Sequence, residues 1–253
     1  MQLRNVIVPV VAGLVLFGGA AAAQEGLPDA DLLAALDAAR FLDGEASQLT
    51  VEILARSADD ARQARLRLSF KEFPGEERVR IDFLAPEELA GQVFLVTAEA
   101  TYFWQPDLFS PLNTSGAQAA FGDAAVAQVG GIRFAGAYRI SGRRMTADAS
   151  GNRQLELQLQ ADRGGLSFPQ ITAVVAPEAL RPVELELIAL SGKPLYRVKF
   201  AAYAELQGDV YVREQLVENL LVEGSSTRIS VVSAAAESLP DSLFDPQRLG
   251  DPR

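Results

Sequence analysis

The sequence predicts an α+β fold that is mainly β, built on a large, curved antiparallel sheet with few helices to cover it. Apolar and polar residues alternate with the period of a half-buried strand in about ten to twelve short segments. Polar turns separate these segments at the spacing of hairpins. No Gly-rich phosphate loop follows a strand and strands do not alternate with helices, so a parallel α/β sheet is excluded.

The first residues have the pattern of a leader. Arg4 is its only charge, residues 6–17 are mostly apolar, and residues 18–23 are small. This order is typical of a secretory signal peptide, expected at residues 1–23. An uncleaved anchor is the alternative, although the stretch is marginal in length for a membrane span. No Cys follows the leader, so residues 24–253 are expected to form one exported domain without a lipid anchor.

Composition removes several classes of chemistry. The 253-residue chain contains no His and no Cys. It therefore has no Ser-His-Asp or Cys-His nucleophile, no thiolate, no disulfide and no imidazole-ligated metal. We expect no catalytic residue, no metal and no cofactor.

The charge balance is acidic. The formal net charge is −10, and loss of Arg4 with the leader makes it −11. This balance argues against nucleic acid or an anionic membrane surface as the main partner. The simpler interpretation is that acidity keeps an exported protein soluble.

Two helices are candidates to cover the sheet. Residues 29–40 place their apolar side chains on one helical face, with Asp29 or Asp31 as the expected cap. Residues 114–129 are rich in Ala but are weakened by Gly116 and Gly122. The second segment is either a mobile lid or an ordinary surface excursion.

The strands begin with a hairpin. Residues 49–55 and 64–70 alternate in polarity on either side of a short polar turn at 57–60. Further strands are expected at 132–140, 155–161, 183–189, 195–203, 210–221 and 227–232.

The segment 78–106 is the most informative part of the chain. Its first strand directs Val79, Ile81 and Phe83 to one face. Its last strand has Tyr102, Phe103 and Trp104 in a row. Adjacent aromatics point to opposite faces, so this strand is covered on both sides or faces an apolar cavity.

Two sequences carry a family resemblance. IDFLAPEELAGQVFLVTAEATYFWQP (81–106) resembles the centre of the outer-membrane lipoprotein carrier superfamily, and LPDSLFDPQRL (239–249) is similar to the way these chains end. The likeness is closest to the outer-membrane lipoprotein-sorting proteins. It implies an unclosed half-barrel, covered by a few helices, that acts in the periplasm as a monomer.

The resemblance also implies a function. Such a carrier shields lipid or the acyl chains of lipoproteins in a hydrophobic cavity, for delivery toward the outer membrane. Its partner would be a membrane-bound donor or acceptor protein. The alternative is a periplasmic sensor of the same fold that recognises a protein or an apolar ligand.

Alternation selects the residues of the expected cavity. For any one of them the simpler interpretation is a solid core, and the cavity interpretation applies to the set. Each buried methylene of an acyl chain is worth about 0.8 kcal/mol, so a carrier needs a dry groove. Phe109 and Phe121 are the expected lid residues. The residues placed on the concave face are Leu68, Phe70, Ile81, Phe83, Phe94, Val96, Trp104, Phe134 and Tyr138.

One feature of these carriers is missing. They hold the lid with an arginine on an early strand, and here Lys71 and Arg78 lie nearest to that position.

Catalysis by paired carboxylates is the remaining class of function. The adjacent acidic pairs, such as Glu87-Glu88, fall in turns or at strand ends, which is typical of ordinary surface.

Overall fold

The computed structural model describes residues 27–42, 46–114, 119–121, 124–125 and 131–251. The predicted signal peptide lies outside these residues. The strands of the main sheet are β1 (Ala46–Arg56), β2 (Ala61–Phe73), β3 (Glu76–Ala85), β4 (Val93–Val96), β5 (Thr101–Trp104), β6 (Leu112–Thr114), β9 (Tyr138–Ala147), β10 (Arg153–Ala161), β11 (Gln170–Ala176), β12 (Arg181–Ile188), β13 (Pro194–Leu206), β14 (Asp209–Asn219) and β15 (Ser226–Ala236).

Five further elements accompany this sheet in the described part of the chain. They are the helix α2 (Asp29–Ala38), the short strands β7 (Ala119–Phe121) and β8 (Ala124–Ala125), and the 3₁₀ helices η1 (Asp241–Phe244) and η2 (Pro246–Arg248).

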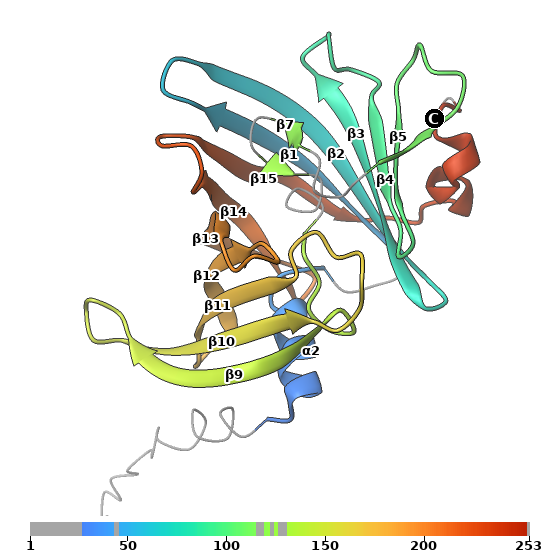
Figure 1. The fold of residues 1–253 in the computed structure, drawn as a ribbon. Helices are drawn as coiled ribbons and strands as arrows, with labels where there is room; N and C mark the ends of the chain where they lie inside the picture. The colour runs from blue at the N-terminus through green and yellow to red at the C-terminus, as the bar shows by residue number, and fades with distance from the viewer. Residues whose placement is uncertain (1–26, 43–45, 115–118, 122–123, 126–130, 252–253) are drawn as a thin grey trace, which may run out of the picture.

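The main sheet has 13 strands in the order β6-β5-β4-β3-β2-β1-β15-β14-β13-β12-β11-β10-β9. Its strand pairs are antiparallel, and its edge strands β6 and β9 do not meet, so the sheet is not closed. Strand β1 pairs with both β2 and β15, which joins the two ends of the chain at the middle of the sheet. The predicted mainly β half-barrel is confirmed (Figure 1).

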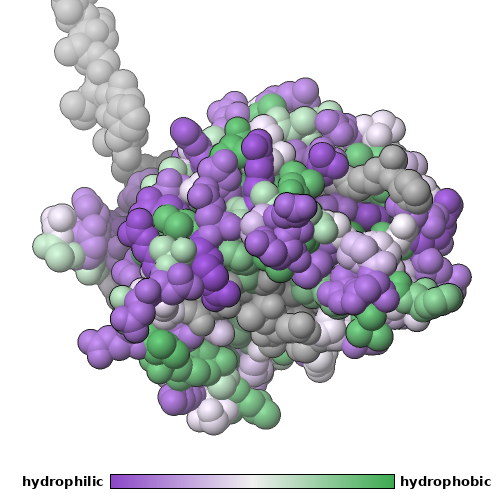
Figure 2. Space-filling view, turned by 90° about the horizontal axis from the view of Figure 1, so that it is seen from above, coloured by the Kyte–Doolittle hydropathy of each residue, from purple (hydrophilic) through white to green (hydrophobic). Residues whose placement is uncertain are grey.

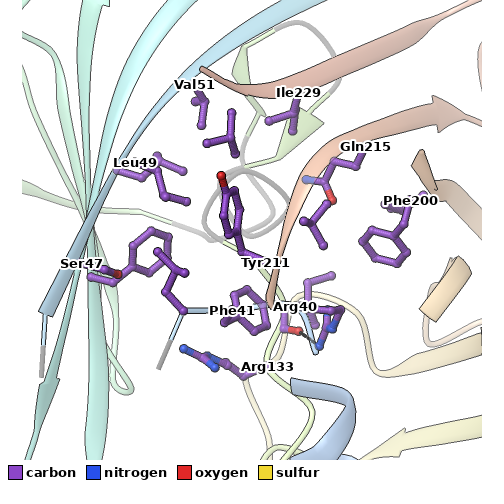
Figure 3. A pocket seen from close by; sticks show the side chains of 18 of the residues that line it. Arg40, Phe41, Ser47, Leu49, Val51, Arg133, Phe200, Tyr211, Gln215 and Ile229 are labelled. Atoms are coloured by element: carbon purple, nitrogen blue, oxygen red, sulfur yellow. Dashed lines mark hydrogen bonds between the residues drawn. The ribbon is translucent and has the colours of Figure 1, made fainter. Parts of the chain in front are cut away.

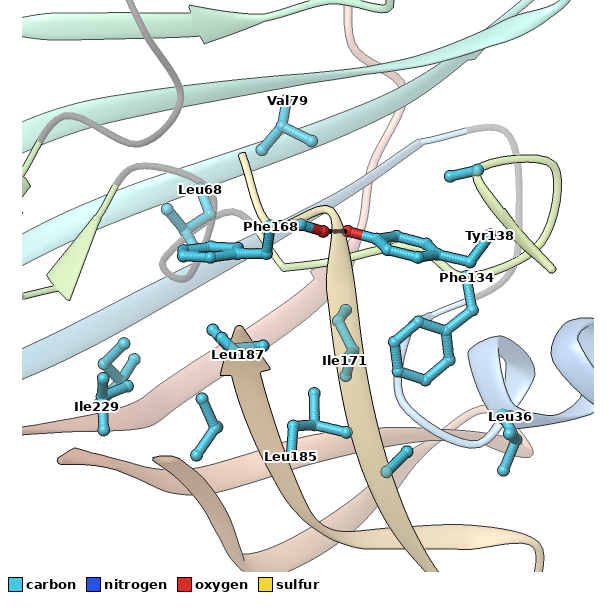
Figure 4. Close-up of a cluster of buried hydrophobic side chains, with 14 of the residues drawn as sticks. Leu36, Leu68, Val79, Phe134, Tyr138, Phe168, Ile171, Leu185, Leu187 and Ile229 are labelled. Atoms are coloured by element: carbon cyan, nitrogen blue, oxygen red, sulfur yellow. Dashed lines mark hydrogen bonds between the residues drawn. The ribbon is translucent and has the colours of Figure 1, made fainter. Parts of the chain in front are cut away.

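The main core lies between the two halves of the curved sheet. Figure 4 shows Leu68 and Val79 of one half facing Ile171, Leu185 and Leu187 of the other half. The space between the halves is filled by Leu36 of α2, Tyr138 at the start of β9, and Phe134 and Phe168 of the connecting segments. The concave face is therefore largely a packed core.

Helix α2 closes one end of this core through three buried leucines, Leu32, Leu33 and Leu36. The predicted caps were wrong: the N-cap is Pro28, and Asp29 and Asp31 lie in the first turn without a capping bond. Their charge still favours the helix, because carboxylates stabilise the positive end of the helix dipole.

Three expectations from the sequence need correction. The segment 114–129 was expected to be helical, but its described residues are the end of β6 and the strands β7 and β8, which pair with each other. The strand expected at 132–140 starts only at Tyr138, because residues 132–134 are irregular and 135–137 form a turn. Strand β11 was not predicted.

The C-terminal segment forms a second layer on the opposite face of β2, β3, β4 and β5. Leu239, Phe244 and Leu249 pack there against Val93 and Leu95. Basic side chains from the sheet bind the backbone of this segment: Lys71 donates to the Leu239 carbonyl, Arg78 to Phe244 at 3.0 Å, and Arg80 to Leu243 at 3.0 Å and Leu249 at 3.3 Å. Lys71 and Arg78, the nearest candidates for a lid arginine, hold the C-terminus instead.

Arg80 provides a test of this second layer. Its side chain is 3 % exposed, and its guanidinium pairs with Asp82 at 3.0 Å. Arg80→Met leaves the Asp82 charge and two carbonyls without this donor, so we expect it to lower the free energy of unfolding by about 3–5 kcal/mol. Urea denaturation measures this change. Arg228→Met, which breaks the exposed Arg228–Glu214 pair, is the control and should cost less than about 1 kcal/mol; equal losses would show that Arg80 has no special role.

Candidate functional site

A narrow pocket of about 80 Å³ opens on the concave face at the junction of the two halves of the sheet. Figure 3 shows side chains from β1, β13, β14 and β15 converging on it, with the Tyr211 ring projecting toward its middle. Apolar side chains make most of its wall: Leu42, Leu49, Val51, Leu68, Phe70, Ile132, Leu185, Val198, Phe200, Val212, Ile229 and Val231.

One end of the pocket is polar and cationic. Arg40 and Arg133 lie there on either side of Phe41 (Figure 3). The guanidinium carbon of Arg40 is 4.7 Å from the centre of the Phe41 ring, and that of Arg133 is 4.0 Å from it. A cation over an aromatic face is attracted by the ring quadrupole, so the two arginines hold Phe41 in this position.

Arg40 and Asp37 form a buried ion pair at 2.6 Å. Asp37 also accepts hydrogen bonds from the backbone N–H groups of Phe134 and Ala135, at 2.9 Å and 2.8 Å. Arg40 donates to the carbonyl of Ile132 at 2.8 Å. The pair thus fastens the segment 132–135 to the end of α2 and fixes one wall of the pocket.

The surroundings of Arg40 and Arg133 shift the pKa values of the two guanidinium groups in opposite directions. Burial lowers the pKa of Arg40 below its ordinary value, although the Asp37 carboxylate opposes the shift. Burial acts in the same direction on Arg133, but its hydrogen bonds and ion pair with Glu77 outweigh burial and raise the pKa of Arg133. The Arg133–Glu77 pair links the segment 131–135 to β3.

The structure places only two of the residues predicted for the cavity, Leu68 and Phe70, in the wall of this pocket. Four others, Ile81, Phe83, Phe94 and Phe134, are buried in the main core beside it. Val96 and Tyr138 also pack on this core and line a wider hollow of about 1030 Å³ that contains acidic residues of β2 and β3. Burial raises the pKa of Tyr138, whose hydroxyl donates to the Phe168 carbonyl at 2.8 Å.

The three remaining predicted residues lie apart. Trp104 lies on the opposite face, under the C-terminal segment, and its indole N–H donates to Leu108 at 3.1 Å. Phe109 is fully exposed in the loop after β5. Phe121 is buried in the main core, and its ring lies 5.8 Å from the Arg62 guanidinium.

Sequence reasoning missed the cationic end and the part of the wall contributed by β13 and β14. Phe200 lies beside a bulge in β13, where the register against β14 shifts twice, so simple alternation does not assign its face. The signal available for Arg40 was its position one turn after Asp37 on the predicted helix.

Both acidic residues of β3 that line the wider hollow, Glu76 and Glu77, are ion-paired. Glu76 pairs with Arg78 at 2.6 Å and accepts from the Ala98 N–H at 2.7 Å. Burial would raise the pKa of Glu76, but these hydrogen bonds prevail and lower it. A carboxylate that stays ionised is a poor general acid at neutral pH. Over the described ranges, no group of three or more His, Cys, Asp or Glu is placed to hold a metal ion.

A protein family described as "-like: Uncharacterized protein" matches residues 75–251. This chain belongs to that family. No curated protein matches it in sequence.

Solved structures share the fold at low sequence identity. A LolA superfamily protein from Nitrosomonas europaea is 20 % identical, with a TM-score of 0.78 over 87 % of this chain and 98 % of that one. A putative outer membrane lipoprotein-sorting protein domain from Vibrio parahaemolyticus is 16 % identical, with a TM-score of 0.74 over 88 % and 98 % of the two chains. A DUF1329 family protein from Desulfovibrio piger is 16 % identical, with a TM-score of 0.73 over 86 % and 95 %. The resemblance to the lipoprotein-sorting superfamily is thus confirmed for the fold.

The helices in the described part of the chain are α2, η1 and η2. These helices are too short or too polar to cross a bilayer.

Gly131 tests whether close contact with Phe41 shapes the cationic end. Its φ is +89°, and an added Cβ would overlap the Phe41 ring. Gly131→Ala should therefore lower the free energy of unfolding by more than the about 1–2 kcal/mol that a positive φ alone costs. Gly75→Ala is a matched control, because Gly75 has φ +85° and no atom within 4 Å of an added Cβ. Similar losses in thermal unfolding would show that Phe41 does not constrain this site.

Proposed function

We propose that this protein is a periplasmic carrier that binds lipid, or the acyl chains of lipoproteins, and delivers them toward the outer membrane. The observation that supports the proposal best is the apolar pocket on the concave face, enclosed by strands from both halves of the sheet. An apolar wall with one polar end suits an amphiphile, because the chain is shielded while the head stays near polar groups. The fold shared with a lipoprotein-sorting domain is consistent with this role.

The pocket is small for such a cargo. Pockets for drug-sized ligands have volumes of roughly 300–1,000 Å³, whereas this one has about 80 Å³. We therefore propose that loading widens the pocket. Phe41 and the segment 131–133 form the described boundary at its cationic end, so their displacement would extend the apolar space. The lid roles of Phe109 and Phe121 stay predictions.

The proposal is tested by native mass spectrometry of the purified protein, followed by organic extraction and lipid analysis. We expect an acylated species at one equivalent. A protein that is empty and also refuses added fatty-acid probes would contradict the carrier function and leave the sensor as the alternative.

Filling the pocket should remove its cargo. Val231 lines the pocket, and the next residue, Val232, is exposed. Val231→Trp should reduce bound lipid at least about tenfold, because the larger side chain occupies the apolar space at a strain of about 1–3 kcal/mol. Val232→Trp is the matched control and should keep its lipid. Extraction from equal amounts of folded protein measures both, and equal retention would argue against this pocket.

The ion pair between Arg133 and Glu77 should control the rate of exchange. Glu77→Gln removes the charge that holds the segment 131–135 to β3. This substitution should destabilise the arrangement in which the segment 131–135 is held to β3 by about 1–1.5 kcal/mol. Release of a fluorescent fatty acid should therefore become about tenfold faster. Stopped-flow displacement measures the rate. Glu156→Gln, which breaks the distant exposed pair with Arg144, should leave it unchanged; equal acceleration would exclude a local effect.

A further inference from the structure

Two neighbouring turns of the sheet expose aliphatic side chains. Leu190, in the turn between β12 and β13, is 83 % exposed. In the turn between β14 and β15, Leu220 is 36 %, Leu221 49 % and Val222 51 % exposed. Most of the surface in Figure 2 is hydrophilic, with hydrophobic side chains in separate small groups. Four of the ten exposed large hydrophobic side chains in the described part of the chain lie on these two turns, which is a local concentration.

The two turns lie side by side. Strand β13 starts where β14 ends, and Tyr196 is paired with Asn219. The N–H of Leu220 donates to the carbonyl of Leu195 at 2.9 Å, which ties the second turn to the base of the first. Together, residues 189–193 and 220–225 form one apolar tip, defined here by Leu190, Leu220, Leu221 and Val222.

We propose that this apolar tip inserts into the surface of an electrically neutral lipid bilayer. The tip consists of turns at the end of a sheet, so it is a projecting feature that can enter a soft interface. Its exposed large side chains are aliphatic, whereas the side chains that dominate protein interfaces are Trp, Tyr and Arg. Aliphatic side chains gain about 25 cal/mol per Å² when they leave water, whatever the partner.

Charge selects the kind of bilayer. The two turns contain one basic residue, Lys193, and one acidic residue, Glu223, so the tip has no net charge. The whole chain has a net charge of −10. A neutral tip on an acidic protein can approach zwitterionic headgroups without a penalty, whereas an anionic surface repels the remainder of the molecule.

The tip is connected directly to the pocket. Strand β13 runs from Leu195, beside the tip, to Val198 and Phe200 in the pocket wall. Five residues of extended chain span about 16 Å. Insertion of the tip would thus hold the pocket within about that distance of the headgroups. The tip would bind a bilayer whether or not the pocket carries lipid, so this inference can hold or fail independently of the proposed carrier function.

Vesicle flotation tests the inference. The purified protein is mixed with phosphatidylcholine vesicles at low and high salt, and with vesicles that also contain phosphatidylglycerol. We expect binding to phosphatidylcholine that is insensitive to salt, and weaker binding at low salt when the anionic lipid is present. Failure to bind phosphatidylcholine, or binding that requires the anionic lipid, would overturn the proposal.

Variants locate the contact. The double variant Leu221→Asp, Val222→Asp should lower the partition coefficient at least about tenfold, and Leu190→Asp in the other turn should lower it in the same direction. Phe109→Asp removes an exposed apolar side chain outside the tip and is the matched control. Unchanged unfolding midpoints confirm that the variants are folded. Loss of binding in Phe109→Asp, with none in the variants of the two turns, would place the contact elsewhere and refute the tip.

Discussion

The buried pair of Asp37 and Arg40 is the constraint on which the cationic end of the pocket depends. Asp37 accepts from the backbone of the segment after residue 131, while Arg40 donates to the same segment and to the carbonyl of Leu36 at 3.2 Å. A buried pair adds little net stability compared with apolar packing, but removal of one partner is strongly unfavourable. Its effect is therefore positional: it fixes an irregular segment, which lacks a strand ladder, against the end of a helix.

The two faces of the sheet are covered by different parts of the chain. The concave face is covered by the opposite half of the same sheet and by α2, because a large sheet with one apolar face requires a second layer. The opposite face of β3 to β5 is apolar as well, and the C-terminal segment covers it. Carbonyls at the ends of short 3₁₀ helices need donors, and Arg78 and Arg80 supply them. The two covers differ, because the concave face is closed by packed side chains, whereas the C-terminal segment is held both by packed side chains and by hydrogen bonds to its backbone.

Sequence patterns predicted the strands well and the faces less well. The hairpin of β1 and β2 followed from strict alternation, and the aromatic run at 102–104 was correctly expected to have apolar surroundings on both faces. The faces were assigned wrongly, because Phe103 packs on the main core and Trp104, expected on the concave face, lies under the C-terminus. Alternation of faces fails where a strand has a β-bulge. Strand β15 has a bulge opposite Thr50 and Val51, and β13 has a bulge beside Phe200. Contacts of high sequence separation, such as Arg133 with Glu77, leave no periodic signal and could not be predicted.

The small volume of the pocket follows from the same packing that stabilises the fold. An apolar void loses the dispersion contacts of its lining, so an empty pocket is more stable when its wall closes on itself. A cargo chain gains about 0.8 kcal/mol for each methylene that it buries, while separating Phe41 from its two arginines forfeits about 0.5–2 kcal/mol for each cation–π contact. A few buried methylenes therefore suffice to offset the opening of the cationic end. If the protein carries acyl chains as proposed, a short apolar ligand would leave the pocket closed and a long acyl chain would open it, so the length of the chain would select the cargo.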